Sequence, residues 1–316
     1  MSAQLRSPAT ARGSGPLRSL REMRDRAAAG TSVRVAVAWA TGAETLEAAA
    51  DARRLGLAEP ILVGPAPSIR EGLEAIGESP ADFEIHASPD PAAAAATCVA
   101  LILAGEASVL LKGALPTSTL MRAVLLPDAG LRTGQLLSDV FIFDYRGGEE
   151  PRIVGITDGG VVPRPDVDQK ERILRNAVAA FQALGIARPA VALLAAVESV
   201  SGAFPSTSDA AEIVRRLGER DAHGFEVEGP LAVDLALSRQ AAAMKGFESK
   251  IAGRADILVF PDLESANMSA KSVEYVAGLE PAHCIMGARA PVLIPSRAET
   301  SGARLSSIAF GALIVR

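Results

Sequence analysis

Apolar and polar positions in the first third of the chain follow a repeated two-part pattern. Buried strands are predicted by short apolar runs at 33–38, 60–64, 83–85 and 109–111. Helices are predicted by the longer segments between these runs, at 41–55, 68–76 and 90–104. Strands that alternate with helices of this length indicate βαβ units and a largely parallel sheet.

The pattern changes in the middle of the chain. Two strand-like segments, 136–145 and 152–157, flank a polar, Gly-rich stretch, which predicts a hairpin with antiparallel strands. A helix is predicted over 168–184, where the apolar residues share one face, and Gly185 ends it. Further strand and helix segments are predicted at 190–196, 208–220, 233–245, 257–260, 267–276 and 291–295. No long linker separates these segments.

Length and composition narrow the class of protein. A chain of 316 residues forms one large or two medium domains. Hydrophobic residues make up 49% of the chain and aromatic residues only 4%, so the core consists of Ala, Val, Leu and Ile. The formal net charge of -5 argues against a nucleic-acid-binding surface, which requires a basic excess. No apolar run approaches the roughly 20 residues of a membrane span, so we expect a protein without a membrane anchor.

Cysteine and histidine positions indicate neither a disulfide framework nor a metal centre. Cys98 and Cys284 are far apart in the sequence, which is typical of a reducing compartment. His86, His223 and His283 have no cysteine or carboxylate cluster beside them in the sequence, so no metal site is expected. Residues 1–16 lack the apolar core of a secretory signal and are expected to form a flexible tail. We therefore expect a cytoplasmic protein.

An ordered series of short sequence blocks spans residues 18–316. The blocks are Leu111-Lys112-Gly113, Thr157-Asp158, Gly229-Pro230-Leu231-Ala232-Val233-Asp234, Ala252-Gly253-Arg254-Ala255-Asp256, Pro261-Asp262-Leu263-Glu264, Gly287-Ala288-Arg289-Ala290-Pro291-Val292 and Ser296-Arg297-Ala298. Together they resemble the phosphate acetyltransferase/butyryltransferase family, and the butyryl side more closely. The resemblance implies transfer of a short acyl group between coenzyme A and inorganic phosphate in a ternary complex.

The same resemblance implies an architecture. It is an α/β fold of two α/β/α domains, each with a largely parallel sheet, separated by a cleft as in isocitrate and isopropylmalate dehydrogenases. The first domain is expected at 17–137 plus 290–316, and the second at 138–289. Acyl-CoA and phosphate are the implied ligands, and coenzyme A acts as a substrate, with no cofactor or metal required. A homodimer that pairs through the second domain is implied as well.

Ser296, Arg297 and Glu299 are the candidate catalytic residues. The Ser-Arg pair follows an apolar strand, and residues at such strand ends point into the crevice of an α/β sheet. In the resembled family, the serine hydrogen-bonds the reacting groups and the arginine holds phosphate oxygens through its bidentate fork. Glu299 is the only carboxylate close behind the pair and is the candidate general base. The alternatives are a capping serine, a surface arginine and a solvated loop glutamate.

Lys112, Gly113, Thr117, Arg122 and Arg132 are candidates for binding coenzyme A or phosphate. A turn from a strand into a helix directs backbone N–H groups toward an anion. Lys112 and Arg122 add positive charge there, and Arg132 lies in a Gly-flanked motif of the butyryl type. The alternatives are that Thr117 is only a helix N-cap and that the arginines lie on the surface.

Asp158 follows a predicted strand and is expected to contribute a hydrogen bond or a hinge on the second-domain side of the cleft. Four positions depart from the butyryl-type pattern, and we expect them to remove polar groups from loops that face the cleft. They are Asp139 in place of His, Val162 and Leu235 each in place of Asn, and Ala266 in place of Gly. The acyl chain length therefore cannot be deduced.

Two other functions fit a fold of this class. One is a weakly catalytic or non-catalytic homologue that binds coenzyme A or acyl phosphate, which the four departures favour. The other is a nicotinamide-dependent decarboxylating dehydrogenase of related fold. That enzyme requires a cluster of Asp metal ligands and an adenosine-binding loop, and the sequence shows neither.

Overall fold

The computed structural model describes residues 15–127, 130–148, 150–218, 224–296 and 298–316. The strands are β1 (Val33–Ala38), β2 (Ala58–Gly64), β3 (Glu84–Ala87), β4 (Val109–Lys112), β5 (Ser138–Tyr145), β6 (Arg152–Thr157), β7 (Ala190–Leu194), β8 (Glu226–Leu231), β9 (Ile257–Val259), β10 (Pro281–Met286) and β11 (Val292–Leu293). The helices are α1 (Leu20–Ala28), α2 (Ala43–Arg54), α3 (Ala66–Ala75), η1 (Pro80–Asp82, a 3-10 turn), α4 (Pro91–Leu103), α5 (Thr117–Val124), α6 (Val167–Ala183), α7 (Pro205–Gly218), α8 (Val233–Leu237), α9 (Arg239–Met244), α10 (Leu263–Tyr275) and α11 (Ser301–Ile314).

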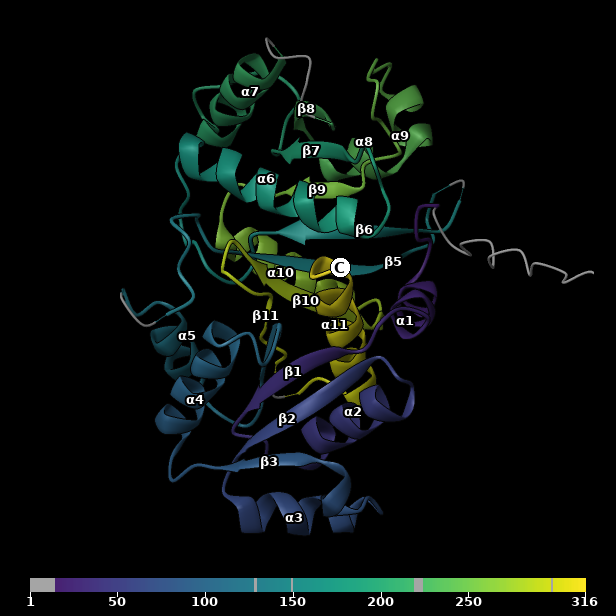
Figure 1. The fold of residues 1–316 in the computed structure, drawn as a ribbon. Helices are drawn as coiled ribbons and strands as arrows, with labels where there is room; N and C mark the ends of the chain where they lie inside the picture. The colour runs from purple at the N-terminus through teal and green to yellow at the C-terminus, as the bar shows by residue number, and fades with distance from the viewer. Residues whose placement is uncertain (1–14, 128–129, 149, 219–223, 297) are drawn as a thin grey trace, which may run out of the picture.

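The described strands form one 11-stranded sheet in the order β3-β2-β1-β4-β11-β10-β5-β6-β9-β7-β8. Neighbours from β3 to β11 are parallel, and so are neighbours from β6 to β8. Between these two parallel parts, β10 and β5 pair antiparallel to each other and to their outer neighbours. The mixed α/β class and the hairpin of β5 and β6 are confirmed. The expectation of one sheet in each half is wrong, because β10 and β5 join the halves into a continuous sheet (Figure 1).

Local signals account for the elements that the sequence predicted well. The Asp90 carboxylate accepts hydrogen bonds from the first N–H groups of α4, and Asp166 forms a capping box with Gln169 at the start of α6. The predicted helix 233–245 is wrong in one respect. Ser238 adopts an extended conformation and caps α9, so the segment divides into α8 and α9.

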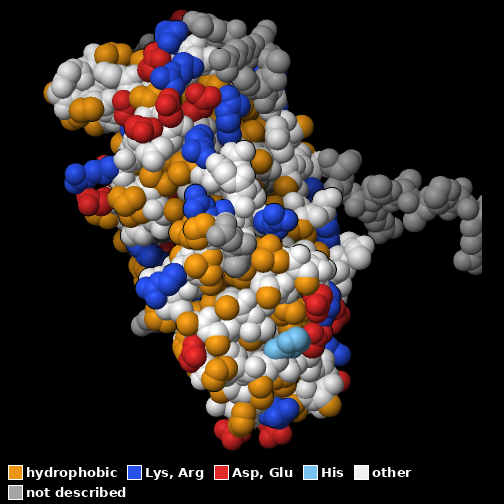
Figure 2. Space-filling model, turned by 60° about the vertical axis from the view of Figure 1, so that its left-hand side comes forward, with side chains coloured by type: hydrophobic (Ala, Val, Ile, Leu, Met, Phe, Trp, Pro, Cys, Tyr) orange, Lys and Arg blue, Asp and Glu red, His pale blue; other side chains and the backbone are white. Residues whose placement is uncertain are grey.

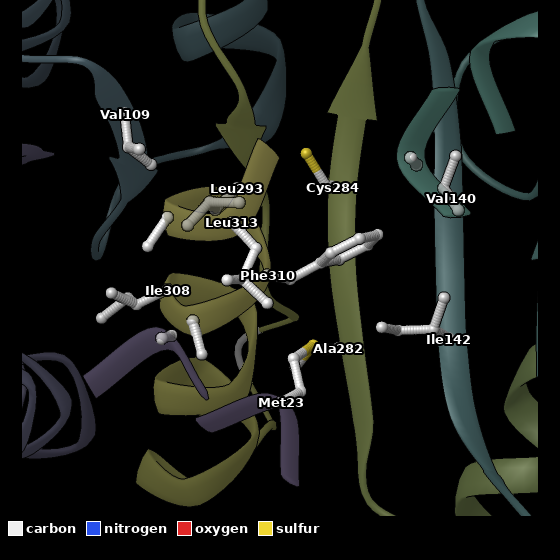
Figure 3. Close-up of a cluster of buried hydrophobic side chains, with 14 of the residues drawn as sticks. Met23, Val109, Val140, Ile142, Ala282, Cys284, Leu293, Ile308, Phe310 and Leu313 are labelled. Atoms are coloured by element: carbon white, nitrogen blue, oxygen red, sulfur yellow. The ribbon is translucent and has the colours of Figure 1, made fainter. Parts of the chain in front are cut away.

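Helices cover both faces of the sheet (Figure 1). On one face, a single apolar cluster extends across the whole sheet and includes side chains from α1, α2, α6, α7 and α11. In Figure 3, α11 lies between β4 and β10, and Phe310 points toward Val140 and Ile142 of β5. Residues 303–313 of this helix are all buried, and the neighbouring strand β11 is only two residues long. None of the described helices is long and apolar enough to cross a membrane.

On the other face, the apolar core is divided. One cluster packs around α4 and α5, and another packs around α8, α9 and α10. Ile285 of β10 belongs to the first cluster, whereas Phe141 of β5 belongs to the second. Because side chains alternate along a strand, His283 and Asp139 lie on this same face, where the two clusters meet. Ionisable side chains therefore occupy the boundary between two apolar cores.

Candidate active site

The loop after β11 is organised around Glu299. The Ser296 N–H donates a hydrogen bond of 2.7 Å to Glu299 Oε1, and the Ser296 carbonyl accepts one of 3.0 Å from Arg304 Nη2. Glu299 is 3% exposed and Arg304 is 4% exposed. The alternative of a solvated loop glutamate is therefore wrong. Arg297, the other half of the predicted Ser-Arg pair, lies outside the described residues.

His283 of β10 lies between two buried carboxylates. Its Nε2 atom is 3.4 Å from Glu299 Oε1, and its Nδ1 atom is 3.5 Å from Asp139 Oδ2. These carboxylates are not its neighbours in the sequence: pairing of β10 with β5 places Asp139 next to it, and the loop after β11 brings in Glu299. A signal was available in the sequence. Asp139 and His283 are ionisable residues next to apolar runs of their strands, and such residues require partners when buried.

The charges around His283 affect its ionisation. Burial by itself lowers the pKa of the imidazole, but the negative charges of Asp139 and Glu299 outweigh burial, and the pKa is raised above its ordinary value. Lys271 of α10 opposes this rise. The histidine therefore carries its proton to higher pH than an exposed histidine does.

His283, Asp139 and Glu299 form an ionisable cluster, and Asp158 extends it to the end of β6. Asp158 is 3% exposed, and its Oδ1 atom accepts hydrogen bonds of 3.0 Å from the N–H groups of Asp139, Gly160 and Val161. Its Oδ2 atom accepts one of 2.8 Å from the Val162 N–H. Burial raises the pKa of Asp158 to about 6, and the nearby Asp139 carboxylate contributes to the rise against the lowering by the backbone donors. Asp158 therefore fixes the loop after β6 and ties it to β5.

Lys112 is the last residue of β4, the strand that pairs with β11, and Gly113 follows it. Lys112 is 2% exposed, and its Nζ atom donates a hydrogen bond of 3.4 Å to the Gly113 carbonyl. A Cβ atom on Gly113 would lie 2.4 Å from the Trp39 carbonyl oxygen, so this turn requires glycine. Ser296 and Gly113 both follow the carboxyl ends of neighbouring parallel strands, and such ends lie at the same edge of a sheet.

The remaining predicted ligand residues are exposed. Thr117 begins α5, and Pro116 occupies the N-cap position, so the alternative of a capping threonine is wrong. Arg122 lies in the last turn of α5. Arg132 forms a β-bridge with Ala288 in the turn that joins β10 to β11, whereas Ser296 follows the other end of β11. Figure 2 shows Lys and Arg side chains across the middle of one face, with Asp and Glu side chains mainly toward its ends.

The four departures from the butyryl-type pattern are buried. Leu235 lies inside α8 and Ala266 inside α10, and both pack in the cluster around α8, α9 and α10. Val162 is 9% exposed in the loop after β6, and Asp139 is 4% exposed in β5. The expectation that these changes lie in cleft-facing loops is therefore wrong for Leu235, Ala266 and Asp139, because regular elements hold them in the interior. In the part of the chain that the structure describes, no group of three or more His, Cys, Asp or Glu residues is arranged to hold a metal ion.

The chain matches known proteins over most of its length. Residues 77–312 match the family model described as phosphate acetyl/butaryl transferase. A phosphate butyryltransferase of Clostridium acetobutylicum is 37% identical over 281 residues, which are 89% of this chain and 93% of the relative. A phosphate acetyltransferase of Rhizobium meliloti is 40% identical over 272 residues, which are 85% of this chain and 84% of the relative.

A solved structure gives the same result. The crystal structure of a branched-chain phosphotransacylase from Enterococcus faecalis V583 superimposes with a TM-score of 0.80 and 28% sequence identity, over 90% of this chain and 99% of that one. These matches favour neither the dehydrogenase nor the non-catalytic homologue. The family predicted from the sequence blocks is confirmed, and the chain belongs to the phosphate acetyl/butaryl transferase family.

Proposed function

We propose that this chain is a phosphate acyltransferase that moves a short acyl group between coenzyme A and inorganic phosphate. The observation that carries the proposal is the burial of Glu299 against Ser296, at the carboxyl end of a central strand, in a chain of this family. Acetyl, butyryl and branched short acyl groups are the substrate class, which the names of the relatives support.

The reaction from acyl-CoA to acyl phosphate consists of three events. A phosphate oxygen attacks the thioester carbon, an oxyanion forms on the carbonyl oxygen, and the C–S bond breaks to release the thiolate. Positive charge and hydrogen-bond donors at the developing oxyanion provide most of the stabilisation. In our proposal the Ser296 hydroxyl and the Arg297 guanidinium supply them, and Lys112, at the neighbouring strand end, adds positive charge.

The reverse direction requires a base. The coenzyme A thiol attacks the carbonyl carbon of the acyl phosphate, its proton is removed, and the C–O bond to phosphate breaks. Glu299 is the proposed base, because one of its oxygens is held by the Ser296 N–H while Oε2 accepts no hydrogen bond from the described residues. Holding both substrates at once makes the step effectively unimolecular, which is itself a large rate contribution.

The other residues have roles in binding. Gly113 and Thr117 place the turn from β4 into α5 against the substrates, and Arg122 and Arg132 bind phosphate groups of coenzyme A. Asp158 fixes the loop on the opposite side. We also propose a cleft between two domains. The first domain consists of residues 17–137 and 290–316, and the second consists of residues 138–289. The proposal also includes a homodimer and a cytoplasmic location, which rest on the sequence.

The test is an arsenolysis assay. Purified protein is mixed with acetyl-CoA or butyryl-CoA and arsenate, and loss of the thioester is followed by ultraviolet absorbance. We expect turnover that falls roughly 100-fold or more in Ser296→Ala, Arg297→Ala and Glu299→Gln, the size seen when one transition-state contact is removed. Ser272→Ala in α10 and Arg21→Ala in α1 are the control variants and should retain turnover. A wild-type protein without turnover on either thioester would overturn the proposal.

A further inference from the structure

His283 contacts two carboxylates that are distant from each other in the sequence. Its ring lies between Asp139 of β5 and Glu299 of the loop after β11. The His283 and Phe141 rings form a T-shaped pair, with 4.8 Å between ring centroids and an interplanar angle of 82°. The His283 N–H donates a hydrogen bond of 2.9 Å to Ser307 Oγ of α11. The backbone and the ring of this residue are thus fixed from three elements.

We propose that His283 is a positioning residue of the acyl-transfer site, whose imidazolium holds the Glu299 carboxylate against Ser296 and links it to Asp139. This inference rests on the proposed function of Glu299 as the base. It assigns a role to a residue that the sequence blocks of the family do not include.

The charge balance of the cluster supports the imidazolium form. Asp139 and Glu299 are 4% and 3% exposed, and buried carboxylates are costly unless positive groups face them. The charged groups around His283 are these two carboxylates, Asp158 behind Asp139, Lys271 on the α10 side and Arg304 beyond Glu299. At neutral pH the three negative carboxylates are balanced by Arg304, Lys271 and a positive His283. A neutral His283 would leave the cluster with an excess of buried negative charge.

The same geometry separates the two oxygens of Glu299. Oε1 accepts the Ser296 N–H and lies 3.4 Å from His283 Nε2, a contact between charges without a hydrogen bond. Oε2 and Asp139 Oδ1 have no hydrogen-bond partner among the described residues. In the direction of thioester synthesis, Oε2 takes the thiol proton as sulfur attacks the acyl carbon and phosphate leaves. The proton then passes to phosphate or solvent. His283 keeps its own proton throughout and acts only by holding Glu299.

Protonation of His283 determines how kcat should depend on pH. The pKa of His283 is raised, so the imidazolium and its hold on Glu299 are complete at low pH and are lost as the pH rises through that raised value. The kcat of the wild-type protein should therefore decline on the alkaline side through the loss of this proton. A histidine with a purely structural role would not produce this decline.

The kinetic test compares wild type, His283→Gln and His283→Phe in thioester synthesis from acyl phosphate and coenzyme A. Gln keeps hydrogen bonding without charge, and Phe keeps ring packing on Phe141. We expect kcat to fall roughly 10- to 100-fold in both, the cost of a misplaced catalytic group, with KM for coenzyme A within about twofold and the alkaline decline lost. His86→Gln is the matched control, because His86 also contacts a glutamate, Glu84, but at the edge of the sheet. Wild-type kcat and pH profile in both His283 variants would overturn the inference.

A second measurement does not depend on activity. In protein with isotope-labelled histidine, NMR gives the imidazole pKa of His283 in wild type, Glu299→Gln and Asp139→Asn. We expect the pKa to fall by about 1 pH unit or more in each variant, as for removal of an opposite charge within about 4–6 Å. An unchanged pKa in both variants would refute the link. Absence of turnover in the wild type would instead overturn the proposed function and the role of His283 with it, whereas normal turnover in the His283 variants overturns only this inference.

Discussion

Replacing Asp158 with Asn should change how the stability of the protein depends on pH. Two effects compete at this carboxylate. Four backbone N–H groups donate to it, which favours the charged form, and burial disfavours that form. Burial wins, and the pKa of Asp158 rises to about 6. The ionised Asp158 of the native protein is therefore a cost to stability at neutral pH, and the uncharged amide of the variant would remove that cost.

The magnitude follows from the difference between the folded and unfolded states. The pKa rises from 3.8 to about 6, and each pH unit corresponds to about 1.4 kcal/mol, so the total is about 3 kcal/mol. Because the folded-state pKa is the higher one, the stabilisation by the neutral carboxyl group is complete below pH 4 and is lost as the pH rises through 6. About 2 kcal/mol of this change develops between pH 4.5 and 7.5.

The assay is urea unfolding followed by circular dichroism at a series of pH values across that window. We expect the free energy of unfolding of Asp158→Asn, relative to wild type, to increase by about 2 kcal/mol from pH 4.5 to 7.5. Asn267→Ala is the control. It removes the donor of a 2.9 Å hydrogen bond to the Gly159 carbonyl in the same loop and changes no ionisable group. The difference in free energy of unfolding between Asn267→Ala and wild type should therefore be the same at every pH.

Two results would refute this reasoning. A constant difference between Asp158→Asn and wild type across the window would mean that burial does not raise the pKa of Asp158. A difference that decreases with rising pH would mean that the four N–H donors outweigh burial and that the charged form stabilises the fold. The second result would also make Asp158 a permanent negative charge beside Asp139, which would strengthen the need for a positive His283.

Two further substitutions test packing near the site. A Cβ atom on Gly155 of β6 would lie 2.6 Å from Phe181 Cε2, so Gly155→Ala should lower the free energy of unfolding by about 1–3 kcal/mol. In a double-mutant cycle, Phe181→Leu should recover part of that loss. If the effects of the two substitutions on the free energy of unfolding were strictly additive, the contact between positions 155 and 181 would be contradicted. Arg304→Met removes the hydrogen bond to the Ser296 carbonyl and should cost about 1–3 kcal/mol. Its kcat in the arsenolysis assay should fall as well, and an unchanged kcat would mean that the loop after β11 holds its shape without Arg304.

Local patterns predicted most of the regular elements. The strand β1 has the predicted bounds, and α4 and α6 begin where aspartates cap them. The helix α11 was missed for a physical reason. Its residues from Ala303 to Leu313 are all buried, so it has no polar face and no amphipathic period. Its serines make internal contacts instead, such as the Ser307 hydroxyl that accepts the His283 N–H.

The candidate site was only partly predictable. Ser296 and Glu299 were found because they are neighbours in a recognisable block, and the structure shows the hydrogen bond between them. Asp139 and His283 were not found, because their proximity depends on the pairing of β5 with β10. A periodic pattern reports which face of a strand is buried but not which strand lies beside it. The order of strands in a sheet is a property of the whole chain.

The short length of β11 explains why the ionisable cluster lies at the centre of the sheet. Pro291 directly precedes β11, and Pro295 follows its last residue by two positions, so neither position offers an N–H to a neighbouring strand. The strand spans only Val292–Leu293, and among the described strands the amino-terminal half of β10 has no partner on that side. α11 occupies the space and accepts the His283 N–H through Ser307. Because β11 ends at Leu293, the chain leaves the sheet there, and the loop that follows brings Glu299 to the His283 ring. The short length of β11 therefore places the proposed base beside its positioning residue.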